Sequence, residues 1–346
     1  MRHFRRLFTL GLITGLMVLR GGAIPVPVPS LDKLTEASTL IVMGQLVSVQ
    51  RVGSASIDAS YLKERFGVVL NSPQINARVE RGSIQVDQVL KGVPPSPTFT
   101  VDFVVPEEFI GWIAPEERAF GLFFFRRTET ETLEFTDPYL TWIQTARGLT
   151  SRGDSPLDRV VSILSTLLSI PDANIETKGN AIVMLQFSKS NASLLALRDS
   201  LSNPTLEVSA RAAGALMWRR DASGLEIFKR VFLQGQPVPK SLEQTLPNTL
   251  GDIGDPNIIP DLEELSGSSS VYMRRGATFA LMRMKSPKAV NALSKMLGDS
   301  DFQVRYNAVV GLADSMGENA WRPSLQEFKS DEIKYLSHWR EGTRTR

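Results

Sequence analysis

The sequence contains no cysteine, which excludes disulfide bonds and thiol chemistry from the whole chain. Histidine is almost as scarce, because only His3 and His338 occur among the 346 residues. A serine nucleophile activated by histidine and a multi-histidine zinc site are therefore not expected. The glycines of Gly251–Gly254 lack the Gly-Lys-Ser/Thr that completes a phosphate-binding loop. We therefore predict a protein without catalytic residues, cofactor or metal.

A long hydrophobic segment is also missing near the N-terminus. The uncharged stretch Leu7–Leu19 has 13 residues, and as a helix it would rise only about 20 Å, short of the ~30 Å hydrocarbon layer. Three arginines precede it and Gly21–Ala23 supplies small residues after it, which is typical of a cleaved secretory signal. We therefore expect residues 1–23 to be a signal peptide. The mature protein is then secreted or periplasmic, without stable membrane insertion.

Strong charge of one sign is absent once the signal is removed. Residues 1–23 hold four of the 39 basic residues and no acidic one, which leaves 35 basic against 37 acidic residues, a net charge of −2. Such a chain has no general electrostatic attraction to nucleic acid. Export without disulfides suits a bacterial envelope protein that is stabilised by packing.

The chain after the signal begins with β structure. Proline alternates with aliphatic residues in Ile24–Pro29, and we expect residues 24–37 to form an extended spacer. Residues 38–144 contain four segments with β-strand composition. These segments are Leu40–Val49, Ser83–Leu90, Thr98–Val105 and Phe120–Arg126. Short strands without long helices between them predict a small β-barrel or sandwich.

Aromatic side chains are concentrated in this β region. Because successive residues of a strand point to opposite faces, the run Phe123–Phe125 must place part of its bulk outside the barrel or under another element. The alternative is a ligand- or glycan-binding surface built from these aromatics. The region resembles the OB-like barrels of secreted proteins, including netrin-like domains, in Leu40–Val49, Val86–Gly92 and Gly121–Phe125. The cysteines of netrin-like domains are absent here.

A polar segment, residues 145–156, separates the β region from the rest and is predicted to be a linker. It contains Arg152, Gly153 and Asp154, a tripeptide that some host adhesion receptors recognise. The alternative is a flexible joint in which these residues follow one another by chance, and the sequence alone favours that alternative.

A helical unit occurs five times in the second half of the chain. Each unit has a leucine in the same place, at Leu185, Leu216, Leu250, Leu281 and Leu312, with steps of 31, 34, 31 and 31 residues. This period predicts a solenoid in which each unit buries its apolar stripe against its neighbours. We expect the array to cover residues 157–340, with a disordered tail at 341–346.

Each unit is predicted to contain two helices, since Ser286–Pro287 interrupts the helical periodicity of Val271–Leu297. The units resemble the short HEAT-like repeats of phycobilisome lyases and bacterial scaffolds. The residues that carry the resemblance are Asp299, Asp301, Val304, Arg305, Ala308 and Leu312. It implies that Asp301, Arg305 and Arg274 cap helices and pair between units. It also offers a lyase-like, chromophore-handling enzyme as an alternative, which the signal peptide disfavours because those lyases are expected in the cytoplasm.

The predicted fold class is therefore α+β multidomain, with a small OB-like β-barrel followed by an all-α HEAT-type solenoid. We expect a non-catalytic scaffold whose solenoid binds a protein partner through the solvent side of its second helices. The residues predicted to form this surface are Arg198, Arg230, Glu263, Glu264 and Lys295. Their alternative role is solubility alone.

The signal peptide gives the first testable prediction. N-terminal sequencing of the protein recovered from an envelope fraction should begin at Ile24. An Ala23→Arg variant should retain its leader, because the peptidase requires small residues before the cleavage site. A wild-type protein that still begins at Met1 in that fraction would contradict the prediction.

Overall fold

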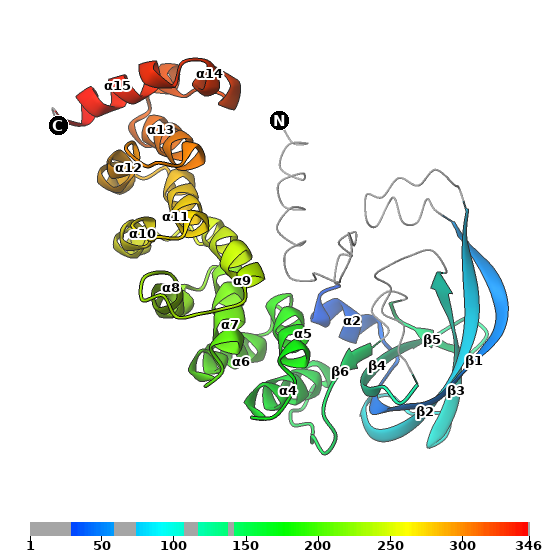
Figure 1. The fold of residues 1–346 in the computed structure, drawn as a ribbon. Helices are drawn as coiled ribbons and strands as arrows, with labels where there is room; N and C mark the ends of the chain where they lie inside the picture. Colours follow the sequence, from blue (N-terminus) through cyan, green and yellow to red (C-terminus); the bar gives the residue numbers. More distant parts are fainter. Residues whose placement is uncertain (1–28, 59–73, 107–116, 138–141, 345–346) are drawn as a thin grey trace. The chain divides into compact units, whose positions relative to one another are not determined.

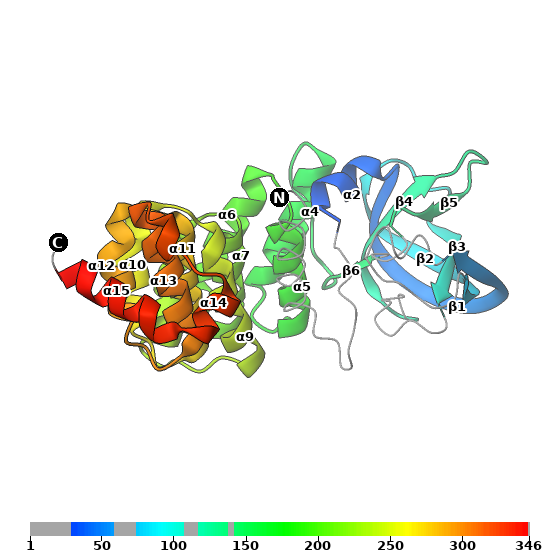
Figure 2. The ribbon, with the colours of Figure 1, turned by 90° about the horizontal axis from the view of Figure 1, so that it is seen from above.

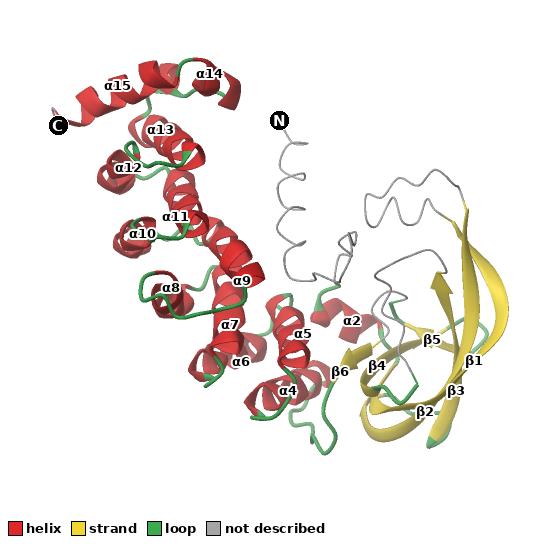
Figure 3. Cartoon of the chain, viewed as in Figure 1, coloured by secondary structure: helices red, strands yellow, loops and turns green. Residues whose placement is uncertain are grey.

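The computed structural model describes residues 29–58, 74–106, 117–137 and 142–344, so the predicted signal peptide lies outside the described residues. The chain divides into two compact units, Met1–Ala196 and Leu197–Arg346. Strands occur only in the first part of the described chain, and helices fill the remainder (Figure 3). An antiparallel sheet followed by helical repeats confirms the coarse architecture predicted from the sequence.

Unit 1 contains one antiparallel sheet with the strand order β3-β2-β1-β4-β5, and β6 also pairs with β4. The strands are β1 (Leu40–Asp58), β2 (Gln74–Lys91), β3 (Thr98–Pro106), β4 (Phe120–Arg127), β5 (Leu133–Phe135) and β6 (Trp142–Gln144). The four predicted strands are confirmed. Strands β1 and β2 are longer than predicted, because their pairing continues to Asp58 opposite Gln74.

The described strands do not form the closed barrel that we predicted. No backbone ladder joins the outer strands β3 and β5 among the described residues, so the sheet is not closed. Strand β5 has only three residues, and its ladder is with β4. The outer strands meet instead through side chains, with the rings of Phe103 and Phe135 5.5 Å apart.

The aromatic side chains of the sheet are core residues. Phe99, Phe123 and Phe125 belong to one buried cluster. Phe124, which alternation places on the opposite face, is also fully buried. Helices α2 (Leu31–Ala37) and α4 (Pro156–Ser169) contact β4 and β2, and α2 lies beside α4 in two perpendicular views (Figures 1 and 2). Both helices therefore pack against strands of the sheet that contains Phe124.

Helix α2 corrects the predicted extended spacer at 24–37, of which residues 24–28 lie outside the described chain. The proline run ends at Pro29, and the hydroxyl of Ser30 accepts a hydrogen bond from the Lys33 backbone N–H at 3.3 Å. Serine in this position starts a helix. Leu31 and Leu34, one turn apart, are both buried. The helix forms because it can bury this pair.

The helical region begins inside unit 1. Helices α4 and α5 (Ile175–Gln186) contact β2 and β6 respectively, and α6 (Asn191–Asp199) follows them. The segment predicted as a linker, 145–156, therefore lies within unit 1. At the other end, α15 (Glu332–Arg344) continues through residues 341–344, which were predicted to be disordered.

Unit 2 consists of paired helices that form two rows (Figure 1). The first helices are α7 (Leu206–Trp218), α9 (Lys240–Thr245) with the 3-10 helix η3 (Leu246–Asp252), α11 (Val271–Met284) and α13 (Phe302–Met316). The second helices are α8 (Leu225–Phe232), α10 (Ile259–Ser266) and α12 (Val290–Met296). After α13 follow α14 (Leu325–Ser330) and α15, and α15 contacts both α12 and α13. All five aligned leucines are fully buried. The predicted repeat is therefore confirmed at the residues that define it.

The first helix of the third repeat is not a regular α-helix throughout. After α9, the chain continues as the 3-10 helix η3, in which Pro247 has no backbone N–H to donate. The next first helix packs closely on this segment through Gly276. A Cβ at Gly276 would lie 2.4 Å from the Pro247 carbonyl oxygen, so only glycine allows this approach. The proline and the glycine thus fit each other across neighbouring units.

Burial of the leucine column predicts that Leu281→Asp destabilises all of unit 2. A charge would replace an apolar side chain that is fully buried, and the loss should exceed the roughly 2–5 kcal/mol typical of a buried leucine-to-alanine change. Circular dichroism during urea denaturation measures this loss. Leu325→Asp, at a residue that is 41% exposed, should change the midpoint little. An unchanged midpoint for Leu281→Asp would contradict the stacked-repeat fold.

Candidate functional site

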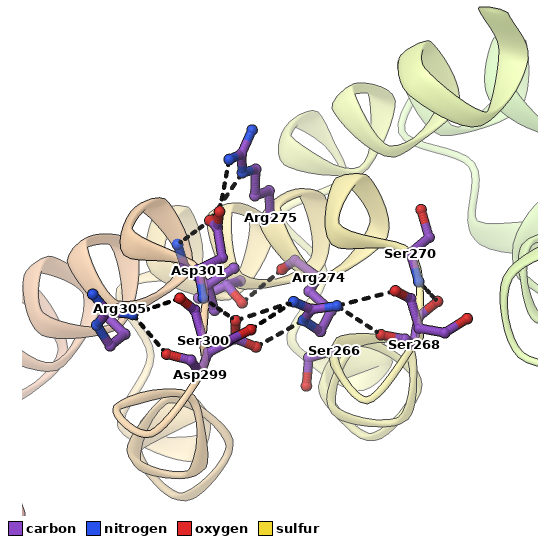
Figure 4. A network of polar contacts seen from close by, with 12 residues as sticks. Ser266, Ser268, Ser270, Arg274, Arg275, Asp299, Ser300, Asp301 and Arg305 are labelled. Atoms are coloured by element: carbon purple, nitrogen blue, oxygen red, sulfur yellow. Dashed lines mark hydrogen bonds and ion pairs between the residues drawn. The ribbon is translucent and has the colours of Figure 1, made fainter. Parts of the chain in front are cut away.

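Arginines at the start of the first helices tie consecutive repeats together (Figure 4). Arg274 of α11 donates from Nε to Asp299 Oδ2 at 2.8 Å and from Nη2 to Asp299 Oδ1 at 3.2 Å. Its Nη1 donates to the backbone carbonyls of Ser268 and Ser269, both at 3.2 Å. One side chain therefore fixes the loop before its own helix and the loop before the next one.

Arg305 repeats this geometry 31 residues later. Its Nη1 donates to the carbonyls of Asp299 and Ser300 at 2.8 and 2.9 Å, and its Nε pairs with Glu332 of α15. Side-chain exposure at Arg305 and Glu332 is 19% and 26%. This confirms the prediction that Arg274 and Arg305 pair between units. We call Arg274, Asp299, Arg305 and Glu332 the arginine column.

Other units hold different residues in the same place. In the first repeat, Lys178 occupies this position. Its side chain is almost fully buried, and its Nζ donates to the Pro171 carbonyl at 3.3 Å. Ser209 and Glu243 occupy the same position in the second and third repeats. Ser209 donates only within its own helix, to the Leu206 carbonyl, and Glu243 accepts from Ser270 Oγ at 3.0 Å. The arginine column therefore belongs to the last units alone.

Asp301 combines a helix cap with an ion pair. Its Oδ1 accepts from the backbone N–H groups of Gln303 and Val304 at 3.0 and 3.1 Å, which confirms the predicted cap. Arg275 donates to both carboxylate oxygens at 2.9 and 2.7 Å. The hydrogen bond from Arg275 lowers the pKa of the Asp301 carboxyl most; burial raises it in part, and the two backbone donors lower it further. Asp301 is therefore held ionised at the helix N-terminus.

The predicted partner-binding residues lie on the second-helix row, and most of them pair with a neighbouring repeat. Arg198 of α6 pairs with Asp221, which precedes α8, at 2.6 Å. Glu263 of α10 pairs with Lys295 of α12. Arg230 donates from Nε to Gln236 Oε1 at 3.2 Å within its own unit. We call Arg198, Arg230, Glu263, Glu264 and Lys295 the second-helix surface.

Sequence reasoning missed Lys229, which links two of these helices. Its Nζ on α8 lies 2.7 Å from Asp261 Oδ1 and 2.9 Å from Glu264 Oε2 on α10. These hydrogen bonds raise the pKa of the Lys229 ammonium. The spacing of Lys229 and Asp261, one repeat apart, was the available signal. Ion pairs therefore connect α8 to α10 and α10 to α12.

The described residues contain no group of three or more histidine, aspartate or glutamate side chains arranged to hold a metal ion. His338 stacks on Trp321 with ring centroids 3.7 Å apart, and its Nε2 lies 3.0 Å from Glu318 Oε2. Among these described residues, no helix has the length and hydropathy to cross a membrane.

Comparisons with known proteins identify the repeats. Residues 239–313 and 259–336 match the family model for HEAT repeats, so the C-terminal half carries these repeats, as the resemblance implied. No curated protein matches the chain in sequence.

Two solved structures are similar to part of the chain. An engineered protein is 18% identical with a TM-score of 0.34, over 46% of this chain and 81% of that chain. Human deoxyhypusine hydroxylase in complex with glycerol is 16% identical with a TM-score of 0.31. That alignment covers 45% of this chain and 62% of the hydroxylase chain.

The Asp301 geometry predicts a pH-dependent contribution to stability. Asp301→Ala removes the cap and the Arg275 pair, and should lower the free energy of unfolding by about 1–2 kcal/mol near neutral pH. Because the pKa of Asp301 is lowered in the folded protein, its contribution is present above the unfolded value of ~3.9 and is lost as the pH falls through the folded value.

Urea denaturation at neutral pH and at acidic pH measures both effects. Asp199→Ala serves as the control, because Asp199 is exposed and its side chain makes no cap hydrogen bond. A difference between wild type and Asp301→Ala that persists unchanged at the lowest pH would contradict this role for the carboxylate.

Proposed function

From the HEAT repeats of residues 239–336 we propose that this protein is an exported, non-catalytic scaffold whose repeat array binds a protein partner. A stack of helix pairs uses its apolar stripes to hold itself together and leaves a long outer wall in solvent. Such a wall suits recognition of another macromolecule rather than enclosure of a small substrate. The single observation that carries the proposal is this division between a buried leucine column and an exposed row of second helices.

The second-helix surface supports recognition of a charged partner. Lys295 is 57% exposed and Glu264 is 56% exposed at the side chain, although both are paired. Charges held by neighbours lose less conformational freedom when a partner arrives, and their arrangement sets specificity and association rate. We propose that the partner presents a complementary row of acidic and basic groups.

Export is part of the proposal and is supported by the sequence of residues 1–23. The absence of cysteine suits a periplasmic or secreted protein that gains its stability by packing. A partner in the envelope or outside the cell follows from that location.

The alternative of ligand or glycan binding through aromatics receives no support from the described sheet. Phe99, Phe103 and Phe123–Phe125 are all buried, so they present no exposed platform for a sugar ring. The lyase-like alternative is likewise favoured by no specific observation in the described residues.

A charge-swap variant tests the role of the second-helix surface. Glu263→Lys combined with Lys295→Glu keeps an ion pair between α10 and α12 but reverses the charges that a partner meets. We expect folding to be unchanged and affinity for the partner to fall at least tenfold, since like charges brought together at an interface oppose binding. The measurement is quantitative affinity capture from the host's envelope fraction with the full secreted chain, followed by titration of the retained protein.

The matched control swaps an exposed ion pair in the sheet. Arg81→Asp with Asp102→Arg alters side chains that are 51% and 46% exposed, and it should capture the same partner as wild type. If both swaps capture the same partner with equal affinity, the second-helix surface is not the binding site.

A further inference from the structure

The turn at residues 151–155 is hydrogen-bonded to two neighbouring elements and leaves two charged side chains in solvent. Ser151 N–H donates to Gln88 Oε1 at 3.3 Å, and Arg152 N–H donates to Ser162 Oγ at 2.7 Å. Arg159 of α4 donates from Nε to the Gly153 carbonyl at 3.1 Å and from Nη2 to the Asp154 carbonyl at 3.3 Å. The segment is thus anchored on both β2 and α4, and it is no flexible joint.

Arg159 also ties the turn to the sheet. Its Nη1 donates to the Leu90 carbonyl at 3.1 Å, so one guanidinium connects β2 with the two central carbonyls of the turn. Immediately after the turn, Ser155 and Asp158 form a reciprocal capping box at the start of α4. The conformation is fixed from both sides before any partner is present.

Glycine is required at the centre of this turn. Gly153 has φ +113°, a conformation that other residues rarely adopt. A Cβ there would lie only 2.5 Å from the Asp158 Cβ. The flanking residues Arg152 and Asp154 are exposed, and neither side chain has a hydrogen-bond or ion-pair partner among the described residues. The two charges contrast with the paired charges of the second-helix surface.

We infer that Arg152, Gly153 and Asp154 form a displayed recognition tripeptide for an adhesion receptor on a host cell. The receptor chemistry that fits is a divalent cation with an open coordination position, which the Asp154 carboxylate completes, beside an acidic pocket for the Arg152 guanidinium. The fixed backbone removes part of the ordering cost of binding. This inference rests on the proposed export, because the tripeptide must meet the receptor outside the producing cell.

Cell attachment to the immobilised full secreted chain tests the inference. Mammalian cells that carry Arg-Gly-Asp-binding receptors should attach in Mg²⁺, and both a chelator and a synthetic Arg-Gly-Asp peptide should abolish attachment. Asp154→Glu keeps the charge but moves the carboxylate by one methylene, and it should reduce attachment to the level of an uncoated surface. Asp172→Glu, at an exposed aspartate of the same unit, should attach cells as well as wild type does.

A second variant tests the conformation of the turn separately from the sequence of the tripeptide. Arg159→Met leaves the tripeptide intact but removes its clamp, and it should weaken attachment without abolishing it. Attachment that is absent in the wild type, insensitive to the peptide, or equal in wild type and Asp154→Glu would overturn the inference. The Glu263/Lys295 swap should attach cells normally, so failure here is distinguishable from failure of the proposed scaffold function.

Discussion

The fold of the second half depends on burying one apolar column that no single repeat can bury alone. Leu216, Leu250, Leu281 and Leu312 are all fully buried. Leu250, Leu281 and Leu312 share one buried cluster with residues of the second helices α8, α10 and α12 and of α14 and α15. Hydrophobic burial carries no direction, so it sets the stacking but not the orientation of one layer on the next. The polar contacts supply that orientation. Arg274 and Arg305 each reach from one loop to the following unit and fix where the next helix begins.

The period of the leucines was sufficient to predict this architecture, because burial repeats at a spacing that the sequence displays directly. The helix caps were predictable for the same reason, since Asp301 precedes a helical stripe. The arginine column was harder to predict across all the repeats. Lys178 occupies the arginine position in the first repeat, and its ammonium donates to a carbonyl. Because the residue type differs, the sequence does not show that Lys178 and Arg274 hold equivalent positions. Lys229 was missed because its partners come from a different repeat and gain meaning only once the repeats are stacked.

In the sheet, the sequence pattern predicts where the strands lie but not whether the sheet closes. Alternation and β-branched composition located β1 to β4, yet closure depends on whether the last short strand reaches the first outer one. Strand β5 has only three residues, too few for alternation to mark it in the sequence. The helix α2 was hidden for a different reason: its two buried leucines are a weak periodic signal beside a long proline run. Both errors concern segments too short to carry a period.

The distribution of paired and unpaired charges links structure to function. Along the helical rows most ionic groups satisfy one another, as at Arg274 with Asp299 and Lys295 with Glu263. Such pairs hold a surface in shape, and each contributes little net stability where it is exposed. The turn at Arg152–Asp154 differs, since hydrogen bonds hold part of its backbone while the side chains of Arg152 and Asp154 are exposed. A charged side chain that the fold neither pairs nor buries costs no folding energy to retain. An unpaired group on a fixed backbone is therefore the kind of feature that a partner can read without first displacing an internal contact.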